Sequence, residues 1–130
     1  MRLLLDTCAF IWCVNEPSRL GAKSREALSD RDSLVHYSPI SAAEIACLSD
    51  RKRIVLDRHW KTWFNHFAMM NGWTCMDITL DIMLEAYSLP DAFHPDPADR
   101  IIVATARRHD LVVVTGDRRI LEYPHVAALS

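Results

Sequence analysis

Residues 111–117 read Leu-Val-Val-Val-Thr-Gly-Asp and carry the strongest structural signal in the chain. The β-branched run predicts a strand, and Gly116-Asp117 ends it. Near the N-terminus, Leu3-Leu4-Leu5 is a shorter apolar run that stops at Asp6. In both segments the apolar residues are contiguous rather than alternating, which is typical of a strand buried on both faces of a parallel sheet.

Helical segments alternate with strand-like segments along the rest of the chain. Ser38-Pro39 and Asp96-Pro97 each combine a helix-capping side chain with a proline suited to the first helical turn. The pattern predicts a single α/β domain over residues 1–130, with a mainly parallel central sheet of about four to five strands flanked by helices on both faces. We expect helices over Thr7–Val14, Ala22–Leu28, Pro39–Ser49, Arg58–Met70, Leu80–Tyr87 and Pro97–Arg108, and strands over Arg2–Asp6, Ser33–Tyr37, Trp73–Ile78, Leu111–Thr115 and Val126–Leu129.

Composition narrows the class of protein. A chain of 130 residues, half of them apolar, is the size of one domain and buries enough surface to fold without disulfide bonds. Fifteen Lys and Arg against seventeen Asp and Glu give a formal net charge of −2, so the global field does not favour a polyanion or an anionic membrane. Any contact with nucleic acid must therefore depend on a local basic patch or on a metal ion.

The sequence also predicts a compartment. Asp6 interrupts the apolar N-terminal run before it reaches the length of a signal peptide, and no apolar stretch approaches the roughly 18–20 residues of a membrane span. Four cysteines lack any Cys-x-x-Cys spacing and have apolar neighbours, so we expect small buried side chains in a reducing compartment, the cytoplasm. They are Cys8, Cys13, Cys47 and Cys75.

Four acidic residues are predicted to meet at one edge of the sheet. Asp6 and Asp117 end the two strongest strands, and ligands of open parallel sheets bind outside these carboxyl ends. Glu44 and Asp99 lie early in two helices that start from the same edge. Carboxylates gathered in one crevice repel one another unless a cation neutralises them, and Mg²⁺ or Mn²⁺ prefers such oxygen ligands. The alternative interpretation of each acid, taken alone, is a helix cap or a turn residue.

Four segments, in their order and context, resemble the PIN-domain family, and the chain looks like its toxin branch, often called VapC, from type II toxin–antitoxin systems. The most specific part is Asp-Pro-x-Asp-Arg at the start of a helix, followed by a strand that ends in Thr-x-Asp. The segments are Leu-Leu-Asp-Thr at 4–7, Ser-Ala-Ala-Glu-Ile at 41–45, Asp-Pro-Ala-Asp-Arg-Ile-Ile-Val-Ala-Thr-Ala at 96–106 and Val-Thr-Gly-Asp at 114–117.

The resemblance implies a single PIN-like domain that acts as a metal-dependent endoribonuclease. Its implied cofactor is Mg²⁺ or Mn²⁺, held by acids that match Asp6, Glu44, Asp99 and Asp117 as catalytic and metal-binding residues. It further implies products with 5′-phosphate and 3′-hydroxyl ends, a cognate antitoxin protein as partner, and a homodimer. The alternative from another class is a catalytically silent PIN-like module that binds RNA or protein.

Several residues beside the acids have supporting roles in this hypothesis. Thr7 and Thr115 offer hydroxyls that could hold a metal-bound water or a phosphate oxygen, although local hydrogen bonding to the backbone explains them as well. Asp96 could be an acid close to the metal, although a helix N-cap ahead of Pro97 explains it as well. Cationic side chains must border an acidic crevice that admits RNA, and Arg100, Arg118 and Arg119 follow the acids directly. Residues 51–53 form a second basic cluster, which could also contact RNA or could simply be a solvated helix end.

The histidines do not predict a zinc site. His59 and His66 are seven residues apart and the other four are scattered, so no ligand spacing emerges. His94, within His-x-Asp-Pro-x-Asp-Arg, resembles a subgroup of the family and is expected to contact substrate or to order its loop. Haloacid-dehalogenase chemistry would need an Asp-x-Asp after the first strand, and Asp6-Thr7-Cys8 lacks the second acid.

Overall fold

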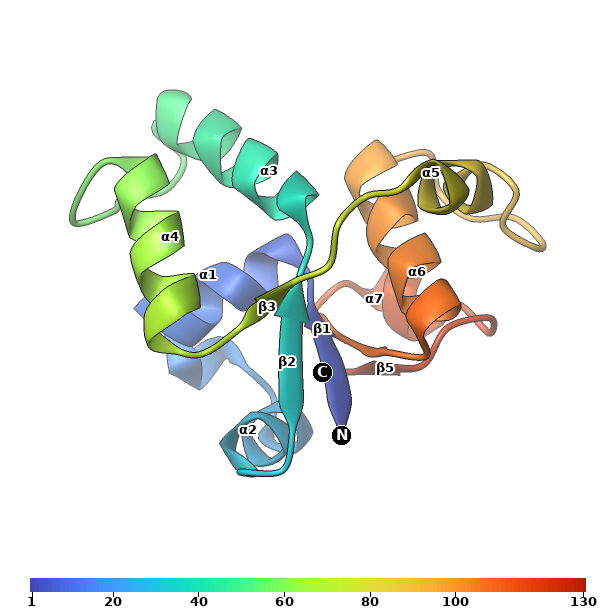
Figure 1. The fold of residues 1–130 in the computed structure, drawn as a ribbon, viewed down its shortest axis with the longest axis horizontal. Helices are drawn as coiled ribbons and strands as arrows, with labels where there is room; N and C mark the ends of the chain where they lie inside the picture. The colour runs from blue at the N-terminus through green and yellow to red at the C-terminus, as the bar shows by residue number, and fades with distance from the viewer.

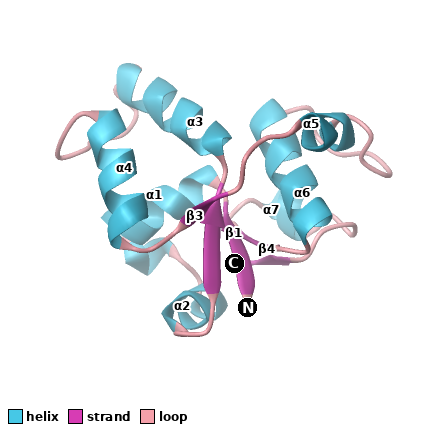
Figure 2. Ribbon diagram, in the orientation of Figure 1, coloured by secondary structure: helices cyan, strands magenta, loops and turns pink.

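The computed structural model describes all residues from Met1 to Ser130. Its five strands form one parallel sheet in the order β3-β2-β1-β4-β5 (Figures 1 and 2). The predicted α/β class and parallel sheet are confirmed. Along the chain the elements are β1 (Arg2–Leu5), α1 (Thr7–Asn15), the 3-10 helix η1 (Pro17–Arg19), α2 (Ala22–Ser29), β2 (Leu34–Tyr37), α3 (Pro39–Asp50), α4 (Trp60–Met70), β3 (Thr74–Cys75), α5 (Leu80–Ala86), α6 (Pro97–His109), β4 (Val112–Val114), α7 (Arg118–Leu121) and β5 (Ala128–Leu129).

The contiguous apolar residues of β1 face two different cores because successive strand residues point to opposite sides of the sheet. Leu3 and Leu5 pack into a core built from α1 to α4. Leu4 packs on the other side, against residues of α6, β4 and α7. All three leucines are fully buried, which explains why the strand does not alternate between apolar and polar residues.

Helix caps fix where the chain leaves the sheet. The Asp6 side chain accepts a hydrogen bond from Ala9 N at 2.8 Å and starts α1 directly at the end of β1. Ser38 caps α3 in the same way, through Ile40 N. Each capped N-terminus therefore lies at the carboxyl edge of the sheet. Figure 1 shows α3 and α4 on one side of this edge, and α5 and α6 on the other.

The structure corrects several predicted boundaries. Helix α4 begins at Trp60 rather than Arg58, because the His59 side chain caps it by accepting from Lys61 N. The edge strands β3 and β5 are only two residues each, shorter than the predicted Trp73–Ile78 and Val126–Leu129. The short helix α7 was not predicted. No helix has the length and apolar character needed to cross a bilayer.

The expectation that the cysteines are buried is wrong for three of the four. Cys8, Cys47 and Cys75 are exposed, and Cys13 is half-buried. Cys8 and Cys47 are on helices whose buried faces are formed by other residues, and Cys75 is on the edge strand β3. Apolar neighbours along the sequence did not indicate which face of an element each thiol occupies.

Phe10 of α1 is the centre of the larger core. Its ring stacks on Phe64 with a centroid distance of 4.6 Å and meets Trp73 edge-on at 4.9 Å. We expect Phe10→Ala to lower the free energy of unfolding by about 3–5 kcal/mol, because it leaves a cavity in this fully buried cluster. Urea unfolding checks this, with Met69→Ala, at an 82% exposed position on α4, as the control. A loss below about 1 kcal/mol would contradict the packing described here.

Candidate metal centre

An open cavity of about 960 Å³ lies at the carboxyl edge of the sheet. Asp6 reaches it from the end of β1, and Asp117 from the loop after β4. Glu44 of α3 and Asp99 of α6 also line it. The structure therefore brings all four sequence-predicted acids to the wall of one cavity.

Asp6 is the most deeply buried of these acids, with only 5% of the residue exposed. Burial raises the pKa of its carboxyl to about 6, against the lowering effect of hydrogen bonds from Thr115 and Ala9. The predicted capping role is real, since Asp6 Oδ1 accepts from Ala9 N. Asp6 therefore both caps α1 and lines the cavity.

Glu44 is held over the cavity by a contact from another element. The Thr7 hydroxyl of α1 donates to Glu44 Oε1 and lies 3.0 Å from Ser41 Oγ. Ser41 and Glu44 have the spacing of a capping box but do not form one, because α3 is capped by Ser38. Burial raises the pKa of Glu44, and its Thr7 hydrogen bond opposes that rise. Thr7 therefore positions Glu44 rather than bonding locally.

Asp99 lies in the first turn of α6, whose N-cap is Asp96 through a 2.9 Å bond from Ala98 N. Burial raises the pKa of Asp99 to about 7, and the nearby carboxylates of Asp96, Asp117, Asp6 and Glu44 raise it further in the same direction. The Asp99 side chain is only 15% exposed. Its carboxyl is thus surrounded by negative charge without a full counter-charge.

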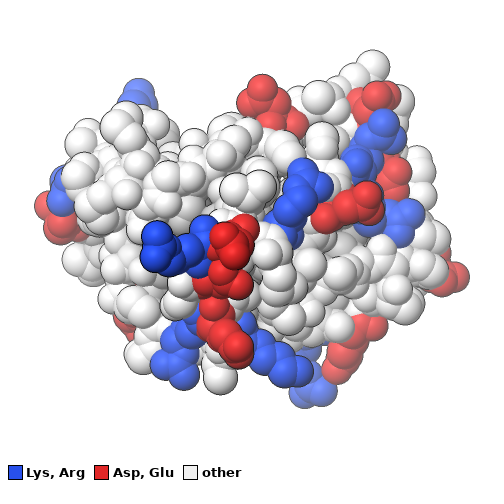
Figure 3. Space-filling view, turned by 60° about the horizontal axis from the view of Figure 1, so that its bottom comes forward, with Lys and Arg blue, Asp and Glu red and all other residues white.

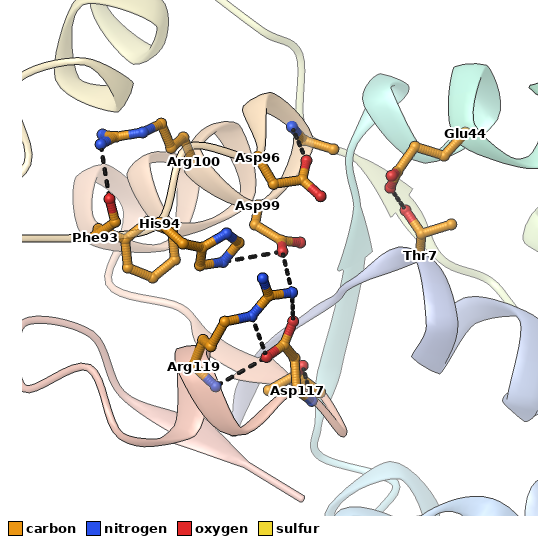
Figure 4. Close-up of polar contacts among 11 residues, drawn as sticks. Thr7, Glu44, Phe93, His94, Asp96, Asp99, Arg100, Asp117 and Arg119 are labelled. Atoms are coloured by element: carbon orange, nitrogen blue, oxygen red, sulfur yellow. Dashed lines mark hydrogen bonds and ion pairs between the residues drawn. The ribbon is translucent and has the colours of Figure 1, made fainter.

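Asp117 differs from the other acids because a cation already neutralises it. Its carboxylate accepts from the backbone and the guanidinium of Arg119, and this pairing lowers the Asp117 pKa. Figure 4 shows the Arg119 guanidinium between Asp117 and Asp99, with the His94 ring beside Asp99. The His94 Nε2 atom is 3.2 Å from Asp99 Oδ2.

The donor set fits a divalent cation. Ligand atoms of His94, Asp99 and Asp117 lie within 4.8 Å of one another. Glu44 stands apart from this group across the cavity (Figure 4). Carboxylate oxygens are the ligands that Mg²⁺ and Mn²⁺ prefer. Burial, together with the neighbouring carboxylates, raises the pKa values of Asp6 and Asp99, and a bound cation would favour their ionised forms. Sequence reasoning did not assign His94 to this group, because its proximity depends on the loop before α6.

The hydroxyl of Thr115 acts within its own turn as well as on Asp6, whose pKa it helps to lower. It accepts a 2.9 Å hydrogen bond from Asp117 N and so shapes the turn between β4 and α7. Gly116 within this turn is required by close packing, since a Cβ there would lie 2.6 Å from Cη2 of Trp12. Trp12 also lines the cavity, a position that sequence reasoning missed.

The arginines predicted to border the crevice divide into two groups. Arg119 lines the cavity, whereas Arg100 and Arg118 do not. The Arg100 guanidinium donates to the carbonyls of Ala86 and Phe93, at 2.9 and 3.0 Å, and anchors α5 and the following loop to α6. These bonds correct the expectation that Arg100 borders the crevice.

Arg118 is 86% exposed and pairs with Glu122 along α7. Arg51, from the second basic cluster, does line the cavity, because the end of α3 comes close to its rim. Figure 3 views the lower face of the molecule, away from the carboxyl edge of the sheet, and shows acidic and basic side chains next to one another there. The structure thus leaves Arg51 and Arg119 as the cationic residues of the cavity wall.

Comparison with known proteins points to one family. The PIN domain family model matches residues 3–126. Ribonuclease VapC22 of Mycobacterium tuberculosis is 35% identical over 123 residues, which cover 95% of this chain and 92% of that protein.

Solved structures share the fold at lower identity. VapBC2 from Rickettsia felis, bound to a DNA fragment from its promoter, matches with a TM-score of 0.72 and 14% identity over 98% of this chain and 97% of that chain. VapC20 of Mycobacterium tuberculosis, a toxin that cleaves the sarcin-ricin loop, matches with a TM-score of 0.63 and 15% identity over 96% and 98%.

The raised pKa of Asp99 predicts how stability depends on pH without metal. Between its ordinary value of 3.8 and about 7, the folded protein keeps a proton that the unfolded chain has lost, so stability falls as pH rises through this window. Asp99→Asn removes this ionisation. In EDTA at pH 8 we expect the variant to be more stable than the parent by on the order of 1–2 kcal/mol, and the difference to shrink near pH 5.

Urea unfolding at both pH values checks the Asp99 prediction. Asp81→Asn is the matched control, because it removes the same charge from an α5 side chain that is 69% exposed. A loss of stability in Asp99→Asn at both pH values would contradict the repulsion and indicate a purely structural role for this carboxyl.

Proposed function

This chain belongs to the PIN-domain family, and we propose that it is a divalent-metal-dependent endoribonuclease, the toxin of a toxin–antitoxin pair. The observation that carries the proposal is the gathering of Asp6, Glu44, Asp99 and Asp117 around one cavity. The relationship to a mycobacterial ribonuclease supports RNA as the substrate. We propose these four acids as the catalytic and metal-binding residues.

The acidic residues and Thr7 would have different roles at the scissile phosphate. Asp6 and Asp117 sit at the strand ends that define the floor of the cavity, while Thr7 keeps the Glu44 carboxylate directed over it. A bound Mg²⁺ or Mn²⁺ supplies Lewis acidity toward phosphate oxygens and lowers the pKa of water. Water attack on phosphorus with departure of the 3′-oxygen leaves 5′-phosphate and 3′-hydroxyl ends, the products we propose.

Arg51 and Arg119 give an acidic cavity a means of holding RNA. They are the cationic side chains on its wall, and phosphate contacts of this kind position nucleic acid without reading its sequence. Cys8, Cys47 and Leu48 also line the cavity beside Arg51, so that part of the wall is less charged. We propose that the RNA backbone enters along Arg51.

We also propose a cognate antitoxin as partner, a homodimer as the assembled form, and the cytoplasm as the location. The neighbouring structures support the antitoxin, since they include toxin–antitoxin complexes from Rickettsia felis and Klebsiella pneumoniae. An RNA substrate and four unpaired thiols favour a reducing, RNA-rich compartment.

Asp6→Asn tests the proposed activity. Asparagine is as good a helix cap as aspartate, so α1 should keep its start while the anionic ligand is lost. We expect the parent to cleave RNA in Mn²⁺ or Mg²⁺ and not in EDTA, and Asp6→Asn to cleave at least about 100-fold more slowly. The assay uses both folded and unstructured RNA, because the fold of the target can decide access.

Two controls make the result of this assay decisive. Asp81→Asn should retain the parent's cleavage rate, which excludes a general effect of the lost charge. Cleavage by Asp6→Asn at the parent's rate would contradict the proposed centre. No cleavage by the parent, together with no Mn²⁺ binding in calorimetry, would favour the silent binding module.

Arg51→Gln tests the proposed path of RNA. Loss of one phosphate contact should raise KM about threefold to tenfold and leave kcat within about a factor of two, because the contact exists in both ground and transition states. Arg53→Gln is the matched control, two residues further on and outside the cavity wall. Equal KM values for the two variants would contradict a specific role for Arg51.

A further inference from the structure

Arg119 occupies both oxygens of the Asp117 carboxylate. Its backbone N–H and its Nε atom donate to Asp117 Oδ1, at 2.8 and 3.2 Å. Its Nη2 atom donates to Asp117 Oδ2 at 2.8 Å and lies 4.0 Å from Asp99 Oδ2. The guanidinium therefore sits beside two of the four acids proposed to hold the metal ion (Figure 4).

A guanidinium and a divalent cation cannot both use this position. Arginine does not lose its proton in proteins, so Arg119 remains a cation under all working conditions. A metal ion near Asp99 and Asp117 would meet electrostatic repulsion from it and would compete with Nη2 for Asp117 Oδ2. For Asp117 to serve as a ligand through that oxygen, the Arg119 side chain has to move.

We propose that Arg119 is a built-in counter-ion of the metal centre, which competes with the divalent cation for Asp117 and Asp99 and so weakens metal binding. This inference rests on the proposed function, because it assigns a regulator to the same four acids. Arg119 is a positioning residue in this account: it keeps the acids together without metal and yields when the ion enters.

The surroundings of Arg119 allow it to leave. Its side chain is 61% exposed, and its ion-pair partners are Asp117 and Asp99 alone. Moving it outward breaks no packing in the core, and the Asp117 cap of α7 keeps its bond from the Arg119 backbone N–H. By contrast, Arg100 is fixed by two carbonyl groups and is not free to act in this way.

The adjacent arginine provides a matched control. Arg118 has the same charge on the same helix, but its guanidinium pairs with Glu122 at 3.0 Å on the solvent side. Arg118→Gln and Arg119→Gln change the net charge equally. A difference between them therefore reports the contact with the acids and not the overall field of the molecule.

Titration calorimetry with Mn²⁺ alone, on the full-length protein without RNA, tests the proposal. We expect Arg119→Gln to bind Mn²⁺ about tenfold more tightly than the parent, and Arg118→Gln to bind within about a factor of two of the parent. In EDTA at pH 8, Arg119→Gln should have a lower Tm than the parent, because the acids lose their counter-charge. A merely structural arginine would lower the Tm without tightening metal binding.

The outcomes separate this inference from the proposed function. Equal or weaker Mn²⁺ binding by Arg119→Gln, with metal-dependent cleavage intact in the parent, would overturn the counter-ion role and leave the nuclease proposal standing. Tighter binding by both arginine variants would overturn it too, since only net charge would matter. Absence of Mn²⁺ binding in every protein would contradict both proposals.

Discussion

The burial of several carboxylates side by side at one edge of the sheet is the constraint on which the rest of the site depends. A parallel sheet places the ends of its strands at one edge, so Asp6 and Asp117 arrive there together, and the capped helices α3 and α6 bring Glu44 and Asp99 to the same cavity. Burial deprives the ionised carboxylates of water and so raises the pKa values of Asp6 and Asp99, and repulsion from the neighbouring carboxylates adds to this rise. A cation bound among these carboxylates would therefore be electrostatically favourable.

The rest of the structure holds this arrangement in place. The two cores on either side of β1 keep its end fixed, and Thr7 connects α1 to α3 by holding Glu44. Arg119 neutralises the charge of Asp117, whereas the negative charge of Asp99 has no full counter-charge. If the Arg119–Asp117 ion pair only stabilised the fold, Asp99 beside it would not be left without a full counter-charge. The excess of negative charge around Asp99 favours a site that binds a metal ion.

Sequence predicted the features that depend on local chemistry. Contiguous apolar strands, capping residues and strand-end acids each follow from a few adjacent residues, and they led to the sheet class and to the acids of the cavity wall. Features decided by tertiary contacts were missed: the exposure of three cysteines, the bonding of Arg100 to the Ala86 carbonyl of α5, and the approach of Arg51 and Trp12 to the cavity. A residue's position along a helix does not reveal which neighbour its long side chain will reach.

A crystal structure of the protein soaked in Mn²⁺, with anomalous diffraction recorded at the manganese edge, tests the central claim most directly. We expect an anomalous peak in the cavity between Asp6, Asp99 and Asp117, with the Arg119 guanidinium turned away from Asp117. Glu44 is expected to face the same peak directly or through water. A fully ordered cavity with no peak at millimolar Mn²⁺, or a peak outside it, would contradict the assignment of these acids to a metal centre.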